Sequence, residues 1–264
     1  MVQTANVVQL KPRTLEAFEE YIREAEAALQ PSLKGDSAFL WSDTDHQRAQ
    51  QVRHGKIVAQ LWAGDGPVKV PNGLIHDWTG AAFVPNATVH QTLALVQNYD
   101  HHKTIYQPEV IDSKLISRHG NDFKIFLRLL KKKIITVVLD TDHDVHYSEV
   151  GPGRRFCRSY TTRIVEVEDI GTEKEHMLEP DTGYGFLWRL YSYWKFDEKS
   201  DERRASAPAA QGVYIECRAI SLTRDIPYGL GWIIDPIIRK LPQESLVHTL
   251  ECTRSALLSK NPVI

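Results

Sequence analysis

Three polar residues stand in strand-like stretches whose neighbouring alternate positions are largely apolar, and they are the first candidates for chemistry. His76, His143 and Arg163 each fall in register with such neighbours. A histidine or arginine on an apolar wall can orient a bound molecule or, in an enzyme, move a proton. The structural alternative is a buried histidine bonded to the backbone, or an arginine at the rim of a sheet. The pattern alone leaves both interpretations open.

Alternating carboxylates at Asp140, Asp142 and Asp144 have the spacing with which a calcium-binding loop begins. Such a loop needs a glycine at its sixth position and a bidentate glutamate at its twelfth. The chain has Val145 and Gly151 at these two places. On a strand the three carboxylates simply share one solvent-facing side, and we expect no metal site here.

No other motif indicates a metal, a nucleotide or a catalytic nucleophile. His101 and His102 are adjacent, and adjacent residues on a helix point in different directions, so they cannot share a metal ion. The two-glycine loop Gly229-Leu230-Gly231 is followed by apolar residues, unlike a phosphate-binding loop. We expect it to let the backbone turn sharply, and an apolar loop there could also cap a cavity entrance. We therefore expect no cofactor and no metal, and we assign no catalytic residue.

The composition favours an ordinary globular protein. The chain has 264 residues, 42% of them hydrophobic and 25% charged, with a formal net charge of -2. This balance gives no electrostatic reason to expect a nucleic acid partner. There is no stretch apolar enough for a membrane span and no signal-peptide pattern, so a cytoplasmic location is the default, unless a leader has been removed. Three cysteines without metal spacing predict neither a zinc site nor a disulfide framework, and the oligomeric state is open.

Periodicity predicts which elements would position these residues. A first amphipathic helix covers 12–29 and is ended by Pro31, and residues 39–73 carry one or two short strands with a turn at 64–67. The last helix spans 236–258 with a break or kink at Pro242. Between them we expect, in order, a strand at 74–84, a helix at 88–106, and strands at 110–117, 123–130, 134–147, 155–167, 186–196 and 213–224. A run of strands between two helices indicates an α+β fold, not a βαβ one.

This order, from about residue 73 to 258, resembles the START-like superfamily, also called SRPBCC or polyketide cyclase-like. The segments that carry the resemblance are Phe83-Val84-Pro85 before a helix, the passage from Tyr99 to Val110, the strand from Trp188 to Phe196 leading on to Gly212–Glu216, and a closing helix from Ser245 to Leu258. The resemblance implies a helix-grip domain over 73–264, a curved antiparallel sheet of seven strands around a long C-terminal helix, with Leu246, Leu250 and Leu257 buried. Residues 1–72 fall outside the pattern of the superfamily, and we expect them to form an N-terminal extension, a helix plus short strands, packed on the main domain.

The resemblance also implies a cavity between the sheet and the closing helix. Members of the superfamily bind lipids, sterols, polyketides or hormones, and some catalyse cyclisation or dehydration. Our first hypothesis is therefore the binding or carrying of an apolar small molecule. A cyclase or dehydratase using His76, His143 or Arg163 is one alternative, and a non-catalytic interaction protein with a filled core is another.

Strand alternation indicates which side chains face that cavity. In 213–224 we assign Val213, Cys217 and Ala219 inward, and the set containing Glu216 and Arg218 to solvent. Small and polar residues beside aromatic ones suggest space for a ligand, with an entrance near 99–106 and 227–234. The expected ligand-binding residues are His76, Trp78, Tyr99, His102, Tyr106, Leu127, His143, Arg163, Trp188, Ser192, Ala219 and Ser221.

Overall fold

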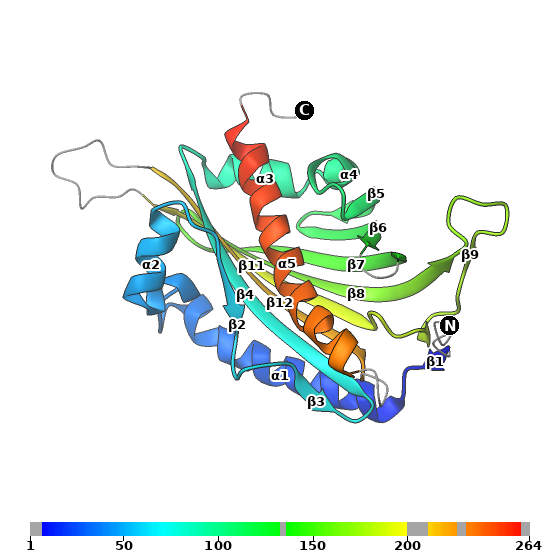
Figure 1. The fold of residues 1–264 in the computed structure, drawn as a ribbon. Helices are drawn as coiled ribbons and strands as arrows, with labels where there is room; N and C mark the ends of the chain where they lie inside the picture. Colours follow the sequence, from blue (N-terminus) through cyan, green and yellow to red (C-terminus); the bar gives the residue numbers. More distant parts are fainter. Residues whose placement is uncertain (1–6, 133–135, 200–210, 226–230, 260–264) are drawn as a thin grey trace.

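A curved antiparallel sheet with helices on both faces makes up the computed structural model of the chain (Figure 1). The structure describes residues 7–132, 136–199, 211–225 and 231–259, with the backbone alone over 231–239. Helix α5 (Gly231–Leu258) crosses one face, which we call the inner face. Helix α1 (Pro12–Lys34) lies against the other, which we call the outer face.

The expected series of antiparallel strands is confirmed. The strands follow the order β2-β4-β12-β11-β8-β7-β6-β5 across the sheet, with short additions at β3 and β9. The seven long strands after residue 73 are β4 (Gly73–Pro85), β5 (Val110–His119), β6 (Asp122–Lys132), β7 (Thr136–Gly151), β8 (Arg154–Glu168), β11 (Arg189–Lys199) and β12 (Gly212–Arg224). The short strands are β1 (Val8–Gln9), β2 (Val58–Leu61), β3 (Val68–Val70), β9 (His176–Met177) and β10 (Thr182–Gly183).

Neither Pro31 nor Pro242 interrupts its helix, although the sequence predicted an end at the first and a break or kink at the second. Helix α1 continues through Pro31 to Lys34 and ends at Gly35, whose φ of 88° is the left-handed conformation of a helix C-cap. Helix α5 begins before Pro236 and runs unbroken through Pro242. A proline inside a helix costs about 3 kcal/mol, and in α5 the burial of apolar side chains further along the helix, described below, offsets that cost.

Two segments differ in helix content from the expectation: one expected helix is interrupted, and one segment expected to hold only short strands also contains a helix. Residues 88–106 do not form one helix, because α3 (Val89–Val96) is followed by a 3-10 turn (Tyr99–His101) and the single-turn helix α4 (His102–Ile105). Within 39–73, a 3-10 turn (Trp41–Thr44) and helix α2 (His46–Arg53) precede the short strands. Asp45 caps α2 by accepting a hydrogen bond of 2.7 Å from the Arg48 amide.

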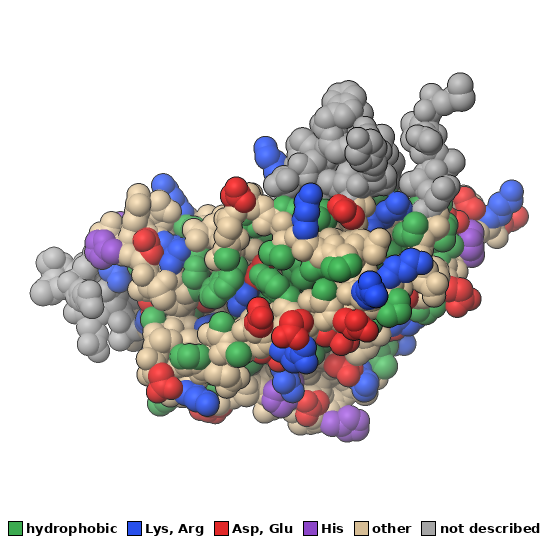
Figure 2. Space-filling model, turned by 90° about the horizontal axis from the view of Figure 1, so that it is seen from below, with side chains coloured by type: hydrophobic (Ala, Val, Ile, Leu, Met, Phe, Trp, Pro, Cys, Tyr) green, Lys and Arg blue, Asp and Glu red, His purple; other side chains and the backbone are tan. Residues whose placement is uncertain are grey.

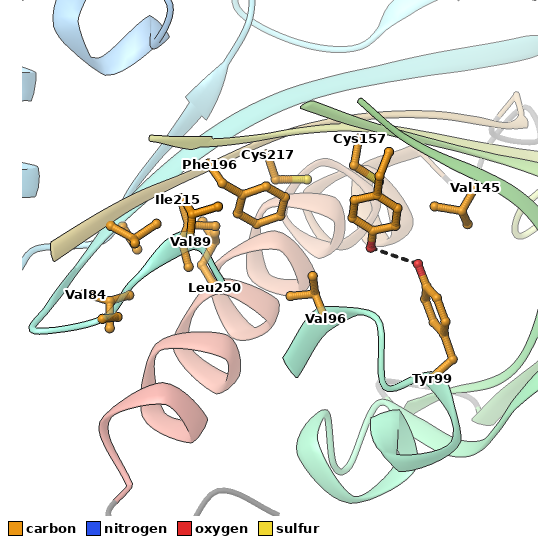
Figure 3. Close-up of a cluster of buried hydrophobic side chains, with 14 of the residues drawn as sticks. Val84, Val89, Val96, Tyr99, Val145, Cys157, Phe196, Ile215, Cys217 and Leu250 are labelled. Atoms are coloured by element: carbon orange, nitrogen blue, oxygen red, sulfur yellow. Dashed lines mark hydrogen bonds between the residues drawn. The ribbon is translucent and has the colours of Figure 1, made fainter. Parts of the chain in front are cut away.

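The main apolar cluster lies between the inner face and α5 (Figure 3). Leu246 and Leu250 of α5 are buried, as expected, while Leu257 is half-buried against the same cluster. Burying a leucine side chain contributes about 1.5–3 kcal/mol, so these residues hold the second half of α5 on the sheet. The sheet contributes Ala82, Val84, Phe123, Ile125, Val145, Tyr147, Cys157, Phe196, Val213, Ile215 and Cys217.

The outer face of β12 is buried, so the expectation that Glu216 and Arg218 face solvent is wrong. Both side chains are 4% exposed. Glu216 accepts hydrogen bonds from the backbone amides of Trp41 and Ser42 at 3.0 and 3.1 Å. The physical reason is that the N-terminal extension covers this face, and two charged residues on one side of a strand do not reveal whether another segment covers them.

Helix α1 supplies most of the cover. Phe18 and Ile22 pack with Ile220 and Leu222 of β12 in a second apolar cluster. Figure 2 views the molecule from below the orientation of Figure 1, the side on which α1 lies, and shows apolar side chains in the middle of that view among acidic and basic ones. Among the described residues, no helix is both long and apolar enough to cross a membrane.

Candidate functional site

The pairing of the strands fixes which side chains share the inner face, because directly opposite residues of antiparallel strands lie on the same side. One rung of the ladder runs through Phe123, Val145, Ser159, Ser192, Ala219 and Trp78. The next rung, also on the inner face, contains Ile125, His143 and Thr161 on β6 to β8, and Leu190, Ser221 and His76 on β11, β12 and β4. Seven of the expected ligand-binding residues therefore stand on one surface beneath α5: His76, Trp78, Leu127, His143, Ser192, Ala219 and Ser221.

One end of this surface is filled. Figure 3 shows Leu250 of α5 and Val96 of α3 facing Phe196, Ile215 and Cys217 on the sheet. Three further expected site residues belong to this packed end. The Tyr99 hydroxyl lies 2.9 Å from that of Tyr147 (Figure 3), the Tyr106 hydroxyl lies 3.1 Å from the Thr253 hydroxyl, and His102 Nε2 lies 3.0 Å from the Val96 carbonyl. These two hydroxyls and His102 Nε2 are thus already bonded within the protein.

The other end of the surface is looser. Several side chains there are only half-buried although they face inward, whereas Phe196, Ile215 and Cys217 in the filled end are at most 2% exposed. Inward-facing positions that remain partly accessible indicate space beside them that protein atoms do not fill. The half-buried inner-face residues are Trp78, Leu127, Leu129, Ser159, Leu190, Ser192, Trp194 and Ala219, which we call the open end.

His143 lies at the open end and is fully bonded. Its Nε2 is 2.9 Å from the Thr141 hydroxyl, and its Nδ1 is 3.3 Å from the Ser159 hydroxyl. Burial lowers the pKa of His143 to about 4, against an opposing effect of Asp144 and with a small further contribution from His102 included in that value. The ring is therefore neutral at neutral pH and is a poor general base there.

A pocket of about 150 Å³ lies where the inner face of β4 meets α5. His76 is buried on its wall, with Nε2 3.1 Å from the Thr223 hydroxyl, and Trp78 is half-buried beside it. Lys240 and Gln243 of α5 form the opposite side. The remaining lining residues come from the end of β2 and the segment after it, namely Leu61, Asp65, Gly66 and Pro67.

Two expected site residues are not on the inner face. A β-bulge between Asp142 and His143 pairs Arg163 with Asp142, while Thr161 pairs with His143. Arg163 is thereby separated from Thr161, and its guanidinium lies 3.4 Å from the Asp142 carboxylate on the outer face. The extra residue of a bulge reverses the alternation, which is why the simple pattern placed Arg163 inward.

Trp188 is the second of these residues. It precedes β11 and packs with Phe18 and Leu222 in the cluster beneath α1. Its backbone amide bonds the Leu222 carbonyl at 2.7 Å. The alternation of β11 starts at Arg189 and does not extend back to Trp188, so the Trp188 side chain packs on the outer face of the sheet.

The expected entrance is only partly described. Residues 99–106 belong to the packed end, with Tyr99 and Tyr106 buried. Of the segment 227–234, residues 227–230 lie outside the described residues, and 231–234 form the start of α5. Among the described residues, a pocket lies instead beside Trp78 and Lys240.

Sequence reasoning missed several residues of this site. Ser159 was overlooked although it alternates with Cys157 and Thr161 along β8, and its contact with His143 depends on strand pairing across the sheet. Lys240 and Gln243 lie in a helix whose facing side cannot be set without the sheet beneath it. Asp65 lies in a segment that was read only as a turn.

A larger pocket of about 300 Å³ lies on the outer side of β5 to β8; most of its lining residues are polar or charged, although the surface it exposes is mainly apolar. Its charged side chains pair with one another: His146 with Asp122 at 2.7 Å, and Lys124 with Asp144 at 3.0 Å. Within the described ranges, no group of three or more histidine, cysteine, aspartate or glutamate side chains could hold a metal ion.

Comparisons with known proteins return structures alone, since no family model and no curated sequence matches the chain. A STAR-related lipid transfer protein from Xanthomonas axonopodis is 16% identical with a TM-score of 0.45, covering 74% of this chain and 100% of its own. Human STARD10 is 10% identical with a TM-score of 0.41, covering 79% of each chain. The Zhui aromatase/cyclase from Streptomyces sp. R1128 is 9% identical with a TM-score of 0.42, covering 69% and 92%.

At these identities and TM-scores the comparisons say nothing about the ligand or activity of this chain. The fold itself is read directly from the sheet order and from α5 lying across the inner face. That architecture is the one expected from the resemblance seen in the sequence.

Proposed function

We propose that this chain, which has the helix-grip fold of the START-like superfamily, binds an apolar small molecule between the open end of its inner face and α5. The observation that carries the proposal is the contrast along one surface. Cys217 in the filled end is 2% exposed, while Ala219, two residues along the same strand and on the same side, is half-buried. A core that served only packing would be filled throughout.

The lining of the open end suits an apolar ligand with few polar groups. Trp78, Leu127 and Trp194 offer aromatic and aliphatic surface, and Ser159 and Ser192 add isolated hydroxyls. Sites for small molecules typically combine an apolar wall with a small number of placed polar groups. Half-buried inward positions also argue against the alternative of a filled core.

Binding is better supported than catalysis. The enzyme alternative relied on His76, His143 or Arg163 for proton transfer. Arg163 stands on the outer face, and His143 is neutral with both ring nitrogens bonded to hydroxyl groups. Neither is therefore poised to exchange protons with a bound molecule at neutral pH.

A matched pair of substitutions tests the proposal. Ala219→Phe places a ring in the open end and should abolish binding of the neutral fluorescent probe Nile red while the protein stays folded. Cys217→Phe places the same ring in the filled end and should destabilise the fold, since overpacking a full core costs about 1–3 kcal/mol. Native mass spectrometry of freshly purified wild-type protein should show bound apolar material, and Ala219→Phe should lack it.

The proposal is wrong if Ala219→Phe destabilises the fold as much as Cys217→Phe. It is equally wrong if Ala219→Phe folds normally and binds Nile red with unchanged affinity. Urea unfolding of both variants, monitored by tryptophan fluorescence, provides the stability comparison.

A further inference from the structure

Three serines stand together on the inner face, on three neighbouring strands. Ser159 of β8 lies directly opposite Ser192 of β11. Ser221 of β12 lies opposite Leu190, which is two residues from Ser192 on the same side of β11. We call these three residues the serine group. Opposite residues in antiparallel strands have Cβ atoms about 4.5–5.5 Å apart, so a single ligand group can reach both Ser159 and Ser192.

The hydrogen-bond chain through His143 fixes what Ser159 can offer. The Thr141 hydroxyl donates to the Leu127 carbonyl at 2.9 Å, so its oxygen accepts from His143 Nε2. Nδ1 of the neutral ring is then an acceptor, and it takes the hydrogen of the Ser159 hydroxyl. Toward the open end, Ser159 therefore presents only an acceptor.

Ser192 is the complement of Ser159. Its oxygen accepts a hydrogen bond of 3.2 Å from the indole of Trp194. Its own hydrogen has no acceptor among the described residues, including Ser159, so Ser192 can donate to a ligand. Ser221 is 8% exposed, and the described part of the chain offers no partner for its hydroxyl.

Charged side chains on this face stand away from the serine group. Those that the register places on the inner face, within the described ranges, are Lys69, Arg118, Lys131, Glu149, Arg155, Glu166, Glu168 and Glu198. Lys69 is exposed on β3, two strands across from Ser221. Each of the others is at least four residues along its strand or three strands across, about 13 Å or more from the nearest serine. Lys131 is paired with Glu109, and Glu166 accepts from three backbone amides of the segment 184–186. An ionised group bound at the serines would have no counter-charge there.

We propose that the apolar ligand carries an uncharged hydroxyl group that accepts a hydrogen bond from Ser192 and donates one to Ser159. The chemical class is a long-chain or polycyclic alcohol, as opposed to a carboxylate or a phosphate ester. This inference rests on the proposed function, because it names the ligand of the same site. A hydroxyl satisfies both serines at once, whereas a carboxylate cannot donate to Ser159 and would be buried without a cation.

Displacement of Nile red by three ten-carbon compounds tests the class. At neutral pH, decan-1-ol should displace the probe at a concentration about tenfold lower than decane or decanoate, the effect expected of two hydrogen bonds worth about 0.5–1.5 kcal/mol each. Ser192→Ala and Ser159→Ala should each weaken the alcohol by about two- to tenfold and leave decane unchanged. Ser148→Ala, on the outer face of β7, is the matched control and should change neither.

The outcomes separate this inference from the proposed function. If all three compounds displace Nile red equally, or if the two serine variants bind decan-1-ol like the wild type, the hydroxyl assignment is overturned while apolar binding stands. If decanoate binds most tightly and Lys240→Ala removes its advantage, the ligand is anionic and lies with its charge at the pocket beside α5. If Nile red itself does not bind, the proposed function fails and the inference fails with it.

Discussion

Gly80 of β4 lies directly beneath Leu250 of α5. A methyl group at Gly80 would stand 3.0 Å from Leu250 Cδ1, 3.2 Å from Leu246 Cδ2 and 3.1 Å from the Val58 carbonyl oxygen. Contacts this close leave no room for a side chain, so the glycine sets how near the helix can approach the sheet. The filled end of the inner face begins at this contact.

Gly80→Ala should therefore lower the free energy of unfolding by about 1–3 kcal/mol, as overpacking does in a full core. Urea unfolding measures the change. Leu250→Ala opens space above the same position, so Gly80→Ala should cost less in a Leu250→Ala background than in the wild type. Strictly additive effects would show that the two residues do not compete for space.

A buried ion pair on the outer face gives a second prediction. Arg218 binds Asp77 through Nε at 3.0 Å and Nη2 at 2.6 Å, and the Tyr21 hydroxyl of α1 donates to the same carboxylate at 2.8 Å. Hydrogen bonds to charged groups contribute about 1.5–3 kcal/mol, so Tyr21→Phe should destabilise the protein by that amount.

Tyr191→Phe is the control for Tyr21→Phe. Tyr191 packs against Phe18 of α1, and the described residues provide no hydrogen bond to its hydroxyl. Removing that oxygen should change the stability by less than about 0.5 kcal/mol. Equal effects of the two substitutions in urea unfolding would show that the link from α1 to Asp77 contributes nothing specific.

The sequence was sufficient to predict the strand series and much of the inner face. Alternation correctly grouped His76 with Trp78 and placed Ala219 and Cys217 toward α5, because a strand has a strict period of two. The same rule failed at Arg163, where one extra residue in a bulge reversed the side. Such an insertion depends on pairing between strands and leaves no signature in the composition.

Burial of charge was equally hidden in the sequence. Glu216 and Arg218 alternate like solvent-facing residues, and only the tertiary placement of α1 and the segment 39–53 shows that they are covered. The donor direction at Ser159 was also out of reach, since it follows from a chain of contacts through His143 across three strands. Local patterns predict which elements form, while long-range packing decides what those elements touch.

The corrected position of Arg163 makes a third prediction. Arg163 and its partner Asp142 have side chains 36% and 38% exposed, and exposed ion pairs contribute at most about 1 kcal/mol. Arg163→Ala should therefore leave Nile red binding unchanged and barely alter the stability. Ser159→Phe, four residues earlier on β8 but facing the open end, should reduce probe binding. If Arg163→Ala folds normally but no longer binds Nile red, Arg163 contributes to the binding site and its assignment to the outer face is wrong.

Two buried histidines make the stability depend on pH. Burial lowers the pKa of both His102 and His143 from 6.5 to about 4 in the folded protein. Between these values the unfolded chain binds protons that the folded chain does not, so stability is fully present above pH 6.5 and is lost as the pH falls. Each group should contribute a loss of about 1.4 kcal/mol per pH unit in this window.

Urea unfolding at a series of pH values between 7 and 5 measures this slope. His143→Gln and His102→Gln should each reduce the slope by about one proton, because glutamine does not titrate. His90→Gln is the control, since His90 is exposed on α3. Probe binding should persist at pH 5 in protein that remains folded, because His143 is still neutral there. A slope that neither substitution alters would mean that the two rings take up protons without opening the fold.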